Sequence, residues 1–329
     1  MTDQVELQSL LRAAEPLIDL AIAEDIGPGD ATSESTLDPQ VWLQGRIVAK
    51  AAGVVAGLPV AEAVFKKVDP AVEFTSHVTD GQEVVPGDLV ATVSGPGPSL
   101  LAAERTALNF LQRFSGIASL TSRYVEAVAL SAATILDTRK TIPGYRVLDK
   151  YAVRMGGGRN HRQSLHDMML IKDNHIEAAG GITAAVTAAR AMHPDLPVEV
   201  EVRDMDELQQ ALSISPPLDR IMLDNMSLAE MRQAVVTTAG RVELEASGNV
   251  TLERVAAIAA TGVDYMSVGA LTHSVRALDL SMEVGAPDRF EAPRDLPARV
   301  ARLKSALAAQ IMVLGHHYQR DEVLAFADA

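Results

Sequence analysis

The sequence predicts an α/β fold in which a β/α barrel follows a smaller antiparallel-sheet domain. Six short apolar runs between Thr134 and Val268 each end in charged or glycine-rich residues, and stretches of helical character separate them. Sequential βα units form parallel sheets, and strands that all carry polar residues at their carboxyl ends favour a barrel with one active-site mouth. Only six strands are clear, so the sequence leaves open whether the barrel closes.

The first part of the chain predicts helices around an antiparallel sheet. Residues 4–24 carry apolar side chains at helical spacing interrupted by Pro16, which predicts two short amphipathic helices. Residues 45–95 alternate β-rich runs with turns, a pattern typical of a small separate antiparallel domain. Residues 102–128 are helical in pattern, with an expected break at Gly116, and lead into the first barrel strand.

These elements divide the chain into three parts. We expect an N-terminal domain over residues 1–115, the barrel over residues 116–285, and a C-terminal extension, with a linker and a helix-like stretch, over residues 286–329. The barrel strands are expected in the runs 134–140, 168–174, 198–204, 220–226, 242–249 and 265–271.

The composition argues against several classes of protein and of binding site. The 329 residues are 48% hydrophobic and 22% charged, which is ordinary for a globular protein. No apolar run approaches the roughly 18 residues of a membrane helix, so we expect neither a membrane span nor a signal peptide. The absence of cysteine excludes disulfides, thiolate zinc sites and cysteine-held iron–sulfur clusters, and fits a cytoplasmic location. A net charge of −14 disfavours nucleic acid as a partner.

A basic cluster stands out against this acidic background. Residues 137–175 hold eight basic and four acidic side chains. Arginine grips a carboxylate through two parallel hydrogen bonds, so Arg139 and Arg162 suit a small dicarboxylate, and His161 and Lys172 add donors. Several cations at one barrel mouth would repel each other unless an anion bound there. The alternative is a solvated basic loop.

Two acidic residues end consecutive predicted strands. Glu201 and Asp224 would lie about 4.8 Å apart if those strands pair, so both carboxylates could address one Mg²⁺, directly or through water. Alternation places Glu199 on the same strand face as Glu201, which makes the barrel interior polar. The alternative is that Glu199, Glu201 and Glu243 form structural ion pairs with Lys140 and Lys172.

Two glycine turns follow the last predicted strands. Ser247-Gly248-Asn249 and Val268-Gly269-Ala270 offer backbone N–H groups to a phosphate. Phosphate sites in β/α barrels commonly use the loops after the last strands. Each turn alone is a weak signal, but the pair at adjacent strand ends is more specific.

Eight motifs in this order resemble the quinolinate phosphoribosyltransferase family, over roughly residues 5 to 284. They are EDIGPGD (24–30), ERTALNFLQRFSGIAS (104–119), LDTRKTIPGYRVLDKYAVRMGGGRNHR (136–162), LIKDNHI (170–176), VEVEV, MLDN, EASGN and SVGALTHS. The resemblance implies a type II phosphoribosyltransferase, with an N-terminal α/β sandwich domain on a partly open β/α barrel. It also implies a homodimer with sites at the subunit interface, and a higher oligomer stays open.

The resemblance implies a reaction. Phosphoribosyl passes from phosphoribosyl pyrophosphate to quinolinate, which is decarboxylated, giving nicotinate mononucleotide, pyrophosphate and CO₂ in NAD biosynthesis. Quinolinate would be bound by Arg105, reaching into the partner's site, and by Arg139, His161, Arg162 and Lys172. Thr138 is counted among the substrate-binding residues without assignment to one substrate. The phosphoribosyl donor and Mg²⁺ would be bound by Lys140, Glu201, Asp224, Ser247, Gly248, Asn249, Val268, Gly269, Ala270 and His273.

Three of these residues have implied catalytic roles. Lys140 and Mg²⁺ would stabilise the departing pyrophosphate, and Glu201 would stabilise the cation-like ribose. Asp224 is the third, and it would hold Mg²⁺ together with Glu201. Three alternatives stay open: a Schiff-base lyase using Lys140 or Lys172, a non-catalytic phosphate or nucleotide sensor, and a molybdenum-associated relative of the same fold.

The C-terminal extension departs from the family. Its end, RLKSALAAQIMVLGHHYQRDEVLAFADA, resembles the opening of quinolinate synthase, the preceding enzyme of the same pathway. That enzyme needs a cysteine-held iron–sulfur cluster, and this chain has no cysteine. The extension is therefore either a remnant of a fused gene or an unrelated terminal helix.

Overall fold

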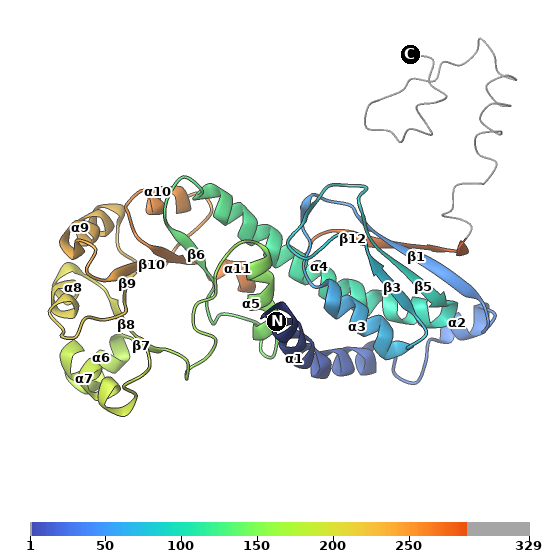
Figure 1. The fold of residues 1–329 in the computed structure, drawn as a ribbon, viewed down its shortest axis with the longest axis horizontal. Coiled ribbons are helices and arrows are strands. Elements are labelled where there is room, and N and C mark those ends of the chain that lie inside the picture. Colours follow the sequence, from blue (N-terminus) through green and yellow to red (C-terminus); the bar gives the residue numbers. More distant parts are fainter. Residues whose placement is uncertain (1, 288–329) are drawn as a thin grey trace, which may run out of the picture.

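The computed structural model describes residues 2–287, and Figure 1 shows an antiparallel sheet and a parallel sheet joined by one long helix. This arrangement confirms the predicted α/β class and the order of the two sheets. The expectations for the C-terminal extension lie outside the described residues from residue 288 onward. Within the described part, no helix is both long enough and apolar enough to span a membrane.

The antiparallel sheet is built from strands of the N-terminal part of the chain together with one strand from the end of the described residues. Its strand order is β12-β1-β5-β3, with a separate β2-β4 pair. The strands are β1 (Trp42–Ala49), β2 (Gly53–Val54), β3 (Glu73–Ser76), β4 (Glu83–Val84), β5 (Leu89–Pro96) and β12 (Leu280–Gly285). The helices of this half are α1 (Thr2–Asp25), α2 (Ala31–Thr36), α3 (Leu58–Val68) and α4 (Gly97–Ala127).

Strand β12 comes from the far end of the described chain. It lies inside the range expected for the barrel, yet it pairs with β1, with Gln44 opposite Gly285 and Ala49 opposite Leu280. Helix α4 runs through residue 115, where the sequence analysis placed the domain junction. After completing the second sheet the chain returns to the first, so the two sheets do not divide at a single point of the sequence. The junction near residue 115 stays a prediction.

The second sheet is parallel and has the order β6-β11-β10-β9-β8-β7. Its strands are β6 (Thr134–Leu136), β7 (Met169–Ile171), β8 (Val198–Val202), β9 (Arg220–Asp224), β10 (Glu243–Ser247) and β11 (Tyr265–Ser267), one in each of the six predicted runs. Among the described residues, β6 and β7 stay at opposite edges, so hydrogen bonding does not close the sheet. All five residues of β8 are buried, as expected for a strand covered on both faces.

Helices cover the outer side of this curved sheet, where Figure 1 shows α6 to α10 in an arc. The helices of this half are α5 (Arg146–Met155), α6 (Asp173–Ala179), α7 (Ile182–Met192), α8 (Met205–Leu212), α9 (Leu228–Thr238), α10 (Val255–Ala259) and α11 (Ala270–His273). Asp204 accepts hydrogen bonds from two amides at the start of α8, and Ser227 accepts one, from Glu230, at the start of α9. The loops that follow β8 and β9 therefore lead directly into capped helices.

Two predicted helix breaks were wrong. Helix α1 continues through Pro16, because Leu10, Ala14 and Ile18 form one buried stripe that packs against neighbouring helices. Helix α4 continues through Gly116, where a side chain would meet the carbonyl oxygen of Arg276 at 2.3 Å. That glycine therefore allows a close approach between two backbone segments and does not end the helix.

Candidate active site

A pocket of about 670 Å³ opens at the carboxyl ends of the parallel strands. All predicted site residues except Arg105 and Val268 line it. The predicted residues are Thr138, Arg139, Lys140, His161, Arg162, Lys172, Glu201, Asp224, Ser247, Gly248, Asn249, Gly269, Ala270 and His273, and the pocket adds Leu170, Met222, Asn225, Val250 and Ser267. Parallel strands bring these groups together because their carboxyl ends meet at one rim.

The two exceptions lie elsewhere. Arg105 is exposed on α4 and is absent from the lining of this pocket. Val268 is 1% exposed, and its N–H donates to the carbonyl oxygen of Leu136 at 2.9 Å, so it is not free to bind a phosphate. Gly269 and Ala270 are the members of that turn that face the pocket.

A buried ion pair holds the backbone of His161. Lys150 pairs with Asp137, and both side chains are almost fully buried. Asp137 accepts the His161 N–H at 2.9 Å, and Lys150 donates to the His161 carbonyl oxygen at 2.9 Å. Both backbone groups of His161 are therefore fixed by side chains behind the pocket, and Lys150 serves the fold of this segment and not the pocket surface.

The positive charges of the two predicted arginines, Arg139 and Arg162, repel each other. Arg162 is half-buried, and its Nη1 donates to the Met168 carbonyl oxygen at 3.1 Å. Burial lowers the pKa of Arg162, and the nearby positive charge of Arg139 lowers it further. Each guanidinium thus raises the free energy of the other, and a carboxylate placed between them would relieve that repulsion.

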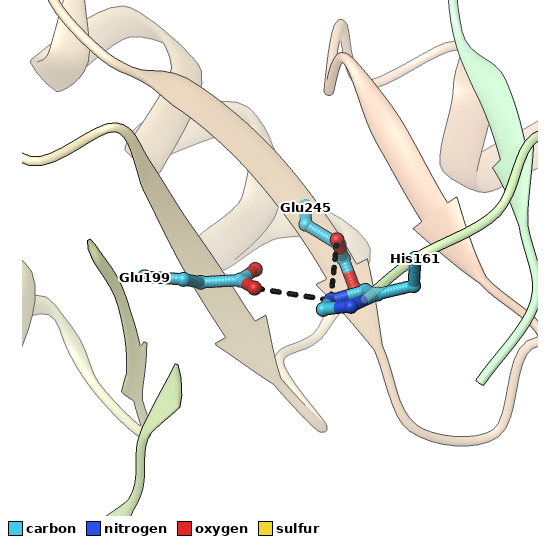
Figure 2. A group of neighbouring side chains, drawn as sticks. All are labelled: His161, Glu199 and Glu245. Carbon is cyan, nitrogen blue, oxygen red and sulfur yellow. Dashed lines mark ion pairs between the residues drawn. The ribbon is translucent and has the colours of Figure 1, made fainter. Parts of the chain in front are cut away.

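Beneath the basic residues lies a buried acidic pair, formed by Glu199 of β8 and Glu245 of β10. Figure 2 shows both carboxylates directed toward the ring of His161, whose Nε2 lies 3.0 Å from Glu199 and 3.5 Å from Glu245. Because His161 Nδ1 accepts the Arg162 N–H at 2.7 Å, Nε2 is the nitrogen that carries the ring's hydrogen. Burial lowers the pKa of His161, so the neutral ring is favoured.

Of the lysine pairs considered as an alternative for Glu199, Glu201 and Glu243, the described residues form only that of Glu201. Glu199 pairs with His161 and not with a lysine, whereas Glu201 does pair with Lys172. Arg220 of β9 donates to Glu245 at 2.8 Å and lies 4.0 Å from Glu243. The ligand atoms of the His161, Glu199 and Glu245 group lie within 4.8 Å of one another. Arg220 already supplies the positive charge that a metal ion would bring there.

Asp224, at the end of β9, lies beside the glycine turn that begins at Ser247, at the end of β10. Asp224 ends β9 opposite Ser247 of β10, and the next residue, Asn225, donates to Asp224 at 2.9 Å. Gly248 has a φ of +88°, and a Cβ there would lie 2.1 Å from the Asn225 side-chain oxygen. The turn therefore requires glycine both for its backbone conformation and for space.

Asn225 is a pocket residue that sequence reasoning did not single out. Its φ is +55°, its N–H donates to the Ser247 carbonyl oxygen at 2.9 Å, and its side chain accepts from Asn249 at 3.3 Å. Its place directly after the aspartate of the MLDN motif was the available signal, because asparagine tolerates positive φ in tight turns.

Comparisons with known proteins agree with this geometry. The family models for the C-terminal and N-terminal domains of quinolinate phosphoribosyl transferase match residues 117–283 and 30–115. A probable carboxylating nicotinate-nucleotide pyrophosphorylase of Synechocystis is 46% identical over 274 residues, covering 82% of this chain and 92% of that protein. Quinolinate phosphoribosyltransferase 1b of Nicotiana tabacum is 44% identical over 286 residues, covering 82% and 81%.

A solved structure extends the likeness to three dimensions. The nicotinate-nucleotide pyrophosphorylase from Francisella tularensis matches with a TM-score of 0.81 and 41% identity, covering 83% of this chain and 96% of that one. The match includes both the antiparallel and the parallel sheet, since it spans most of the described residues.

Proposed function

Because this chain belongs to the quinolinate phosphoribosyltransferase family, we propose that the pocket at the strand ends is where quinolinate and phosphoribosyl pyrophosphate react. The chain has the activity of a carboxylating nicotinate-nucleotide pyrophosphorylase, a pentosyltransferase of de novo NAD biosynthesis. The alternatives of a Schiff-base lyase, a sensor and a molybdenum-associated relative have no support among the relatives reported above.

One observation carries the assignment of residues to roles. Arg139, Arg162 and Lys172 come from separate segments, yet they line the same pocket as Glu201 and Asp224. Dehydrating a carboxylate costs several kcal/mol, so a dianion needs more than one cation. The two arginines and Lys172 provide three, and Thr138 and His161 line the pocket beside them.

The phosphoribosyl donor occupies the opposite end of the pocket. The turns at Gly248 and Gly269 present backbone N–H groups to its phosphates, and Lys140 passes over Gly269, where an added Cβ would lie 3.1 Å from Lys140 Cδ. His273 lies beside the same glycine, since its Nε2 would be 3.1 Å from that Cβ. Lys140 is thus placed to stabilise negative charge on the departing pyrophosphate.

Glu201 and Asp224 are the residues that would hold Mg²⁺. Both line the pocket near the ends of neighbouring strands, although Glu201 lies opposite Met222 and not opposite Asp224 as expected. Carboxylate oxygens are the ligands that Mg²⁺ prefers. Such an ion would neutralise part of the pyrophosphate charge. Glu201, which pairs with Lys172 in the free chain, can also stabilise the positive charge that develops on the ribose.

The steps follow from this arrangement. The ring nitrogen of quinolinate attacks C1 of the ribose as the bond from C1 to the pyrophosphate oxygen breaks. The bond from ring C2 to its carboxylate then breaks, CO₂ leaves, and the electron pair remains on C2 beside the pyridinium nitrogen. A solvent proton adds at C2 and gives nicotinate mononucleotide. The basic residues hold the ring in line for the first step.

The assembly and the location of the enzyme belong to the same proposal. Arg105 is exposed on α4 and outside its own chain's pocket, which suits a homodimer in which it reaches the partner's site. Higher assemblies built from that dimer are compatible with it. We place the enzyme in the cytoplasm, although the Arabidopsis thaliana relative is named as chloroplastic.

The test is a product assay with quinolinate labelled at its 2-carboxylate. Purified chain, phosphoribosyl pyrophosphate and Mg²⁺ should yield nicotinate mononucleotide and labelled CO₂ in equal amounts. Nicotinate is the control substrate, because a site built for two carboxylates should reject it strongly. Arg162→Lys should lower kcat/KM for quinolinate at least about tenfold, since lysine cannot form the paired hydrogen bonds. Equal turnover of nicotinate and quinolinate would overturn the proposal.

A further inference from the structure

Thr272 touches both loops at the phosphate end of the pocket without lining the pocket itself. It lies on α11 between Gly269 and His273, and it is 1% exposed. Its hydroxyl donates to the carbonyl oxygen of Lys140 at 2.9 Å and lies 3.4 Å from the carbonyl oxygen of Gly269. Thr272 therefore joins the loop that follows β6 to the loop that follows β11.

The backbone of Thr272 is held from the other side by α4. Arg113 Nη2 donates to the Thr272 carbonyl oxygen at 3.3 Å, and the same nitrogen lies 3.0 Å from each carboxylate oxygen of Asp149. Asp149 belongs to α5 and is fully buried, and the Arg113 guanidinium lies 5.7 Å from the Tyr145 ring centre. A charge-assisted pair between two helices, with its carboxylate fully buried, holds this guanidinium in place.

Lys140 is constrained at two points by these contacts. Its carbonyl oxygen is bound by Thr272, and its side chain passes so close to Gly269 that an added Cβ there would lie 3.1 Å from Lys140 Cδ. A lysine side chain is long and has many rotamers, so the direction of its ammonium depends on a fixed backbone and on the surface that it crosses. Thr272 fixes the backbone of Lys140, and Gly269 forms part of the surface that its side chain crosses.

We propose that Thr272, braced by Arg113 and Asp149, is a positioning residue that fixes the backbone from which Lys140 reaches the pyrophosphate of the donor. The inference rests on the role proposed above for Lys140. A small misplacement of a group that acts on the leaving pyrophosphate lowers the rate strongly. The loss should fall on use of the phosphoribosyl donor and spare the binding of quinolinate, which contacts other residues.

The first test compares Thr272→Val with Thr272→Ser. Valine keeps the shape and removes the hydroxyl, so kcat/KM for phosphoribosyl pyrophosphate should fall at least about tenfold. The dissociation constant of quinolinate, measured by calorimetry without donor, should stay within about twofold, and serine should restore most of the lost turnover. Thr261→Val is the matched control, because Thr261 is also buried and its hydroxyl donates to a backbone carbonyl oxygen, that of Ile258.

The second test asks whether Thr272 acts through Lys140. Lys140→Met alone should lower kcat strongly, and adding Thr272→Val should then cost little more. If Thr272→Val lowers the activity of the Lys140→Met enzyme by its full factor, the two residues act independently and the inference is overturned. If Lys140→Met has no effect, the proposed role of Lys140 fails instead, which separates the two outcomes.

Folding controls keep the test decisive. Thr272→Ala adds no atoms and replaces Thr272→Val if the valine variant does not fold. Unfolding of both variants, or an equal loss for donor turnover and quinolinate binding, would show that Thr272 serves the fold generally, and the inference would be wrong.

Discussion

Glu199 and Glu245 are buried carboxyl groups directly beneath a basic pocket. Burial raises the pKa of Glu245 to about 7, and repulsion from Glu199 adds to the effect. Burial likewise raises the pKa of Glu199 to about 7, while the charge of Arg220 opposes the rise. Protonation at neutral pH therefore relieves a repulsion that the folded chain creates and the unfolded chain lacks.

The pH dependence of stability should show this effect. The folded pKa of Glu245, about 7, lies above the ordinary value of 4.5, so the folded chain binds more protons between these values. The stabilising contribution of Glu245 is complete below about 4.5 and is lost as the pH rises through about 7. The Glu245→Gln side chain cannot ionise. Between pH 5 and pH 8 the free energy of unfolding of this variant, relative to the wild type, should therefore rise by on the order of 1 to 3 kcal/mol, which corresponds to a rise of a few degrees in relative Tm.

Glu243→Gln provides the control on the same strand. Glu243 is exposed and also lies near Arg220, so its replacement removes a carboxylate beside that arginine without relieving a buried charge. A Tm difference for Glu245→Gln that is constant, or that falls as the pH rises, would contradict the account.

Gly248 provides a second prediction at the scale of single residues. Gly248→Ala would place a methyl group against the Asn225 side chain, so KM for phosphoribosyl pyrophosphate should rise at least about tenfold. Gly240→Ala is the matched control, because Gly240 also has a positive φ, +73°, but an added Cβ there would have nothing within 4 Å. Steady-state kinetics at saturating quinolinate measure the difference, and equal KM values for the two variants would refute the role given to this turn.

Sequence patterns located most of the residues that line the pocket, because most of them follow a predicted strand, while His161 and Arg162 follow a glycine-rich loop. They did not reveal what lies behind those residues. Lys150 looked like another member of the basic cluster, but it is buried against Asp137. The partner of Glu199 is His161, which comes from a loop 38 positions earlier in the chain. Such pairings depend on tertiary contacts between segments, and local spacing carries no information about them.

At the scale of elements, helix α4 carries both Arg105, at the expected subunit interface, and Arg113, which holds Thr272. Arg105 lies on an exposed face of the helix, and at Gly116 the helix passes close to the backbone of Arg276. Eight residues separate the two arginines, which is about 12 Å along a helix. One rigid element therefore links the expected subunit interface to the loop that carries Lys140.

Gly116→Ala tests how closely α4 must approach the segment after α11. The added methyl group would lie 2.3 Å from the Arg276 carbonyl oxygen and 3.0 Å from the Ala277 Cα, and backbone atoms cannot move aside cheaply. We expect a loss of about 1 to 3 kcal/mol in stability, measured by thermal unfolding. Glu126→Ala, at an exposed position of the same helix, should change Tm little. A Gly116→Ala enzyme as stable as the wild type would contradict the observed packing.

Some helices and strands could be predicted from local sequence patterns, and others could not. The six parallel strands could be predicted, because each apolar run ends in polar residues and its type does not depend on distant partners. The continuity of α1 through Pro16 and of α4 through Gly116 could not, because burial of Leu10, Ala14 and Ile18 and the approach of Arg276 override local preference. The pairing of β12 with β1 joins segments more than 200 residues apart, and nothing local to β12 indicates it.

At the scale of the whole molecule, the position of Arg105 predicts shared active sites. If each site takes Arg105 from the partner, Arg105→Ala and Lys140→Met should each abolish most activity. Co-expression of the two variants should then restore about one quarter of the wild-type activity, because half of the random dimers are mixed and each has one intact site of two. Mixtures that stay as inactive as the single variants would show that Arg105 serves its own chain or no site.

The most direct measurement is a crystal structure of the enzyme with quinolinate, Mg²⁺ and an unreactive analogue of phosphoribosyl pyrophosphate. The account predicts quinolinate carboxylates within hydrogen-bond distance of Arg139, Arg162 and Lys172. It also predicts the pyrophosphate group beside Lys140 and the metal between it and the carboxylates of Glu201 and Asp224. Quinolinate bound away from these arginines, or a donor bound outside the pocket, would contradict it.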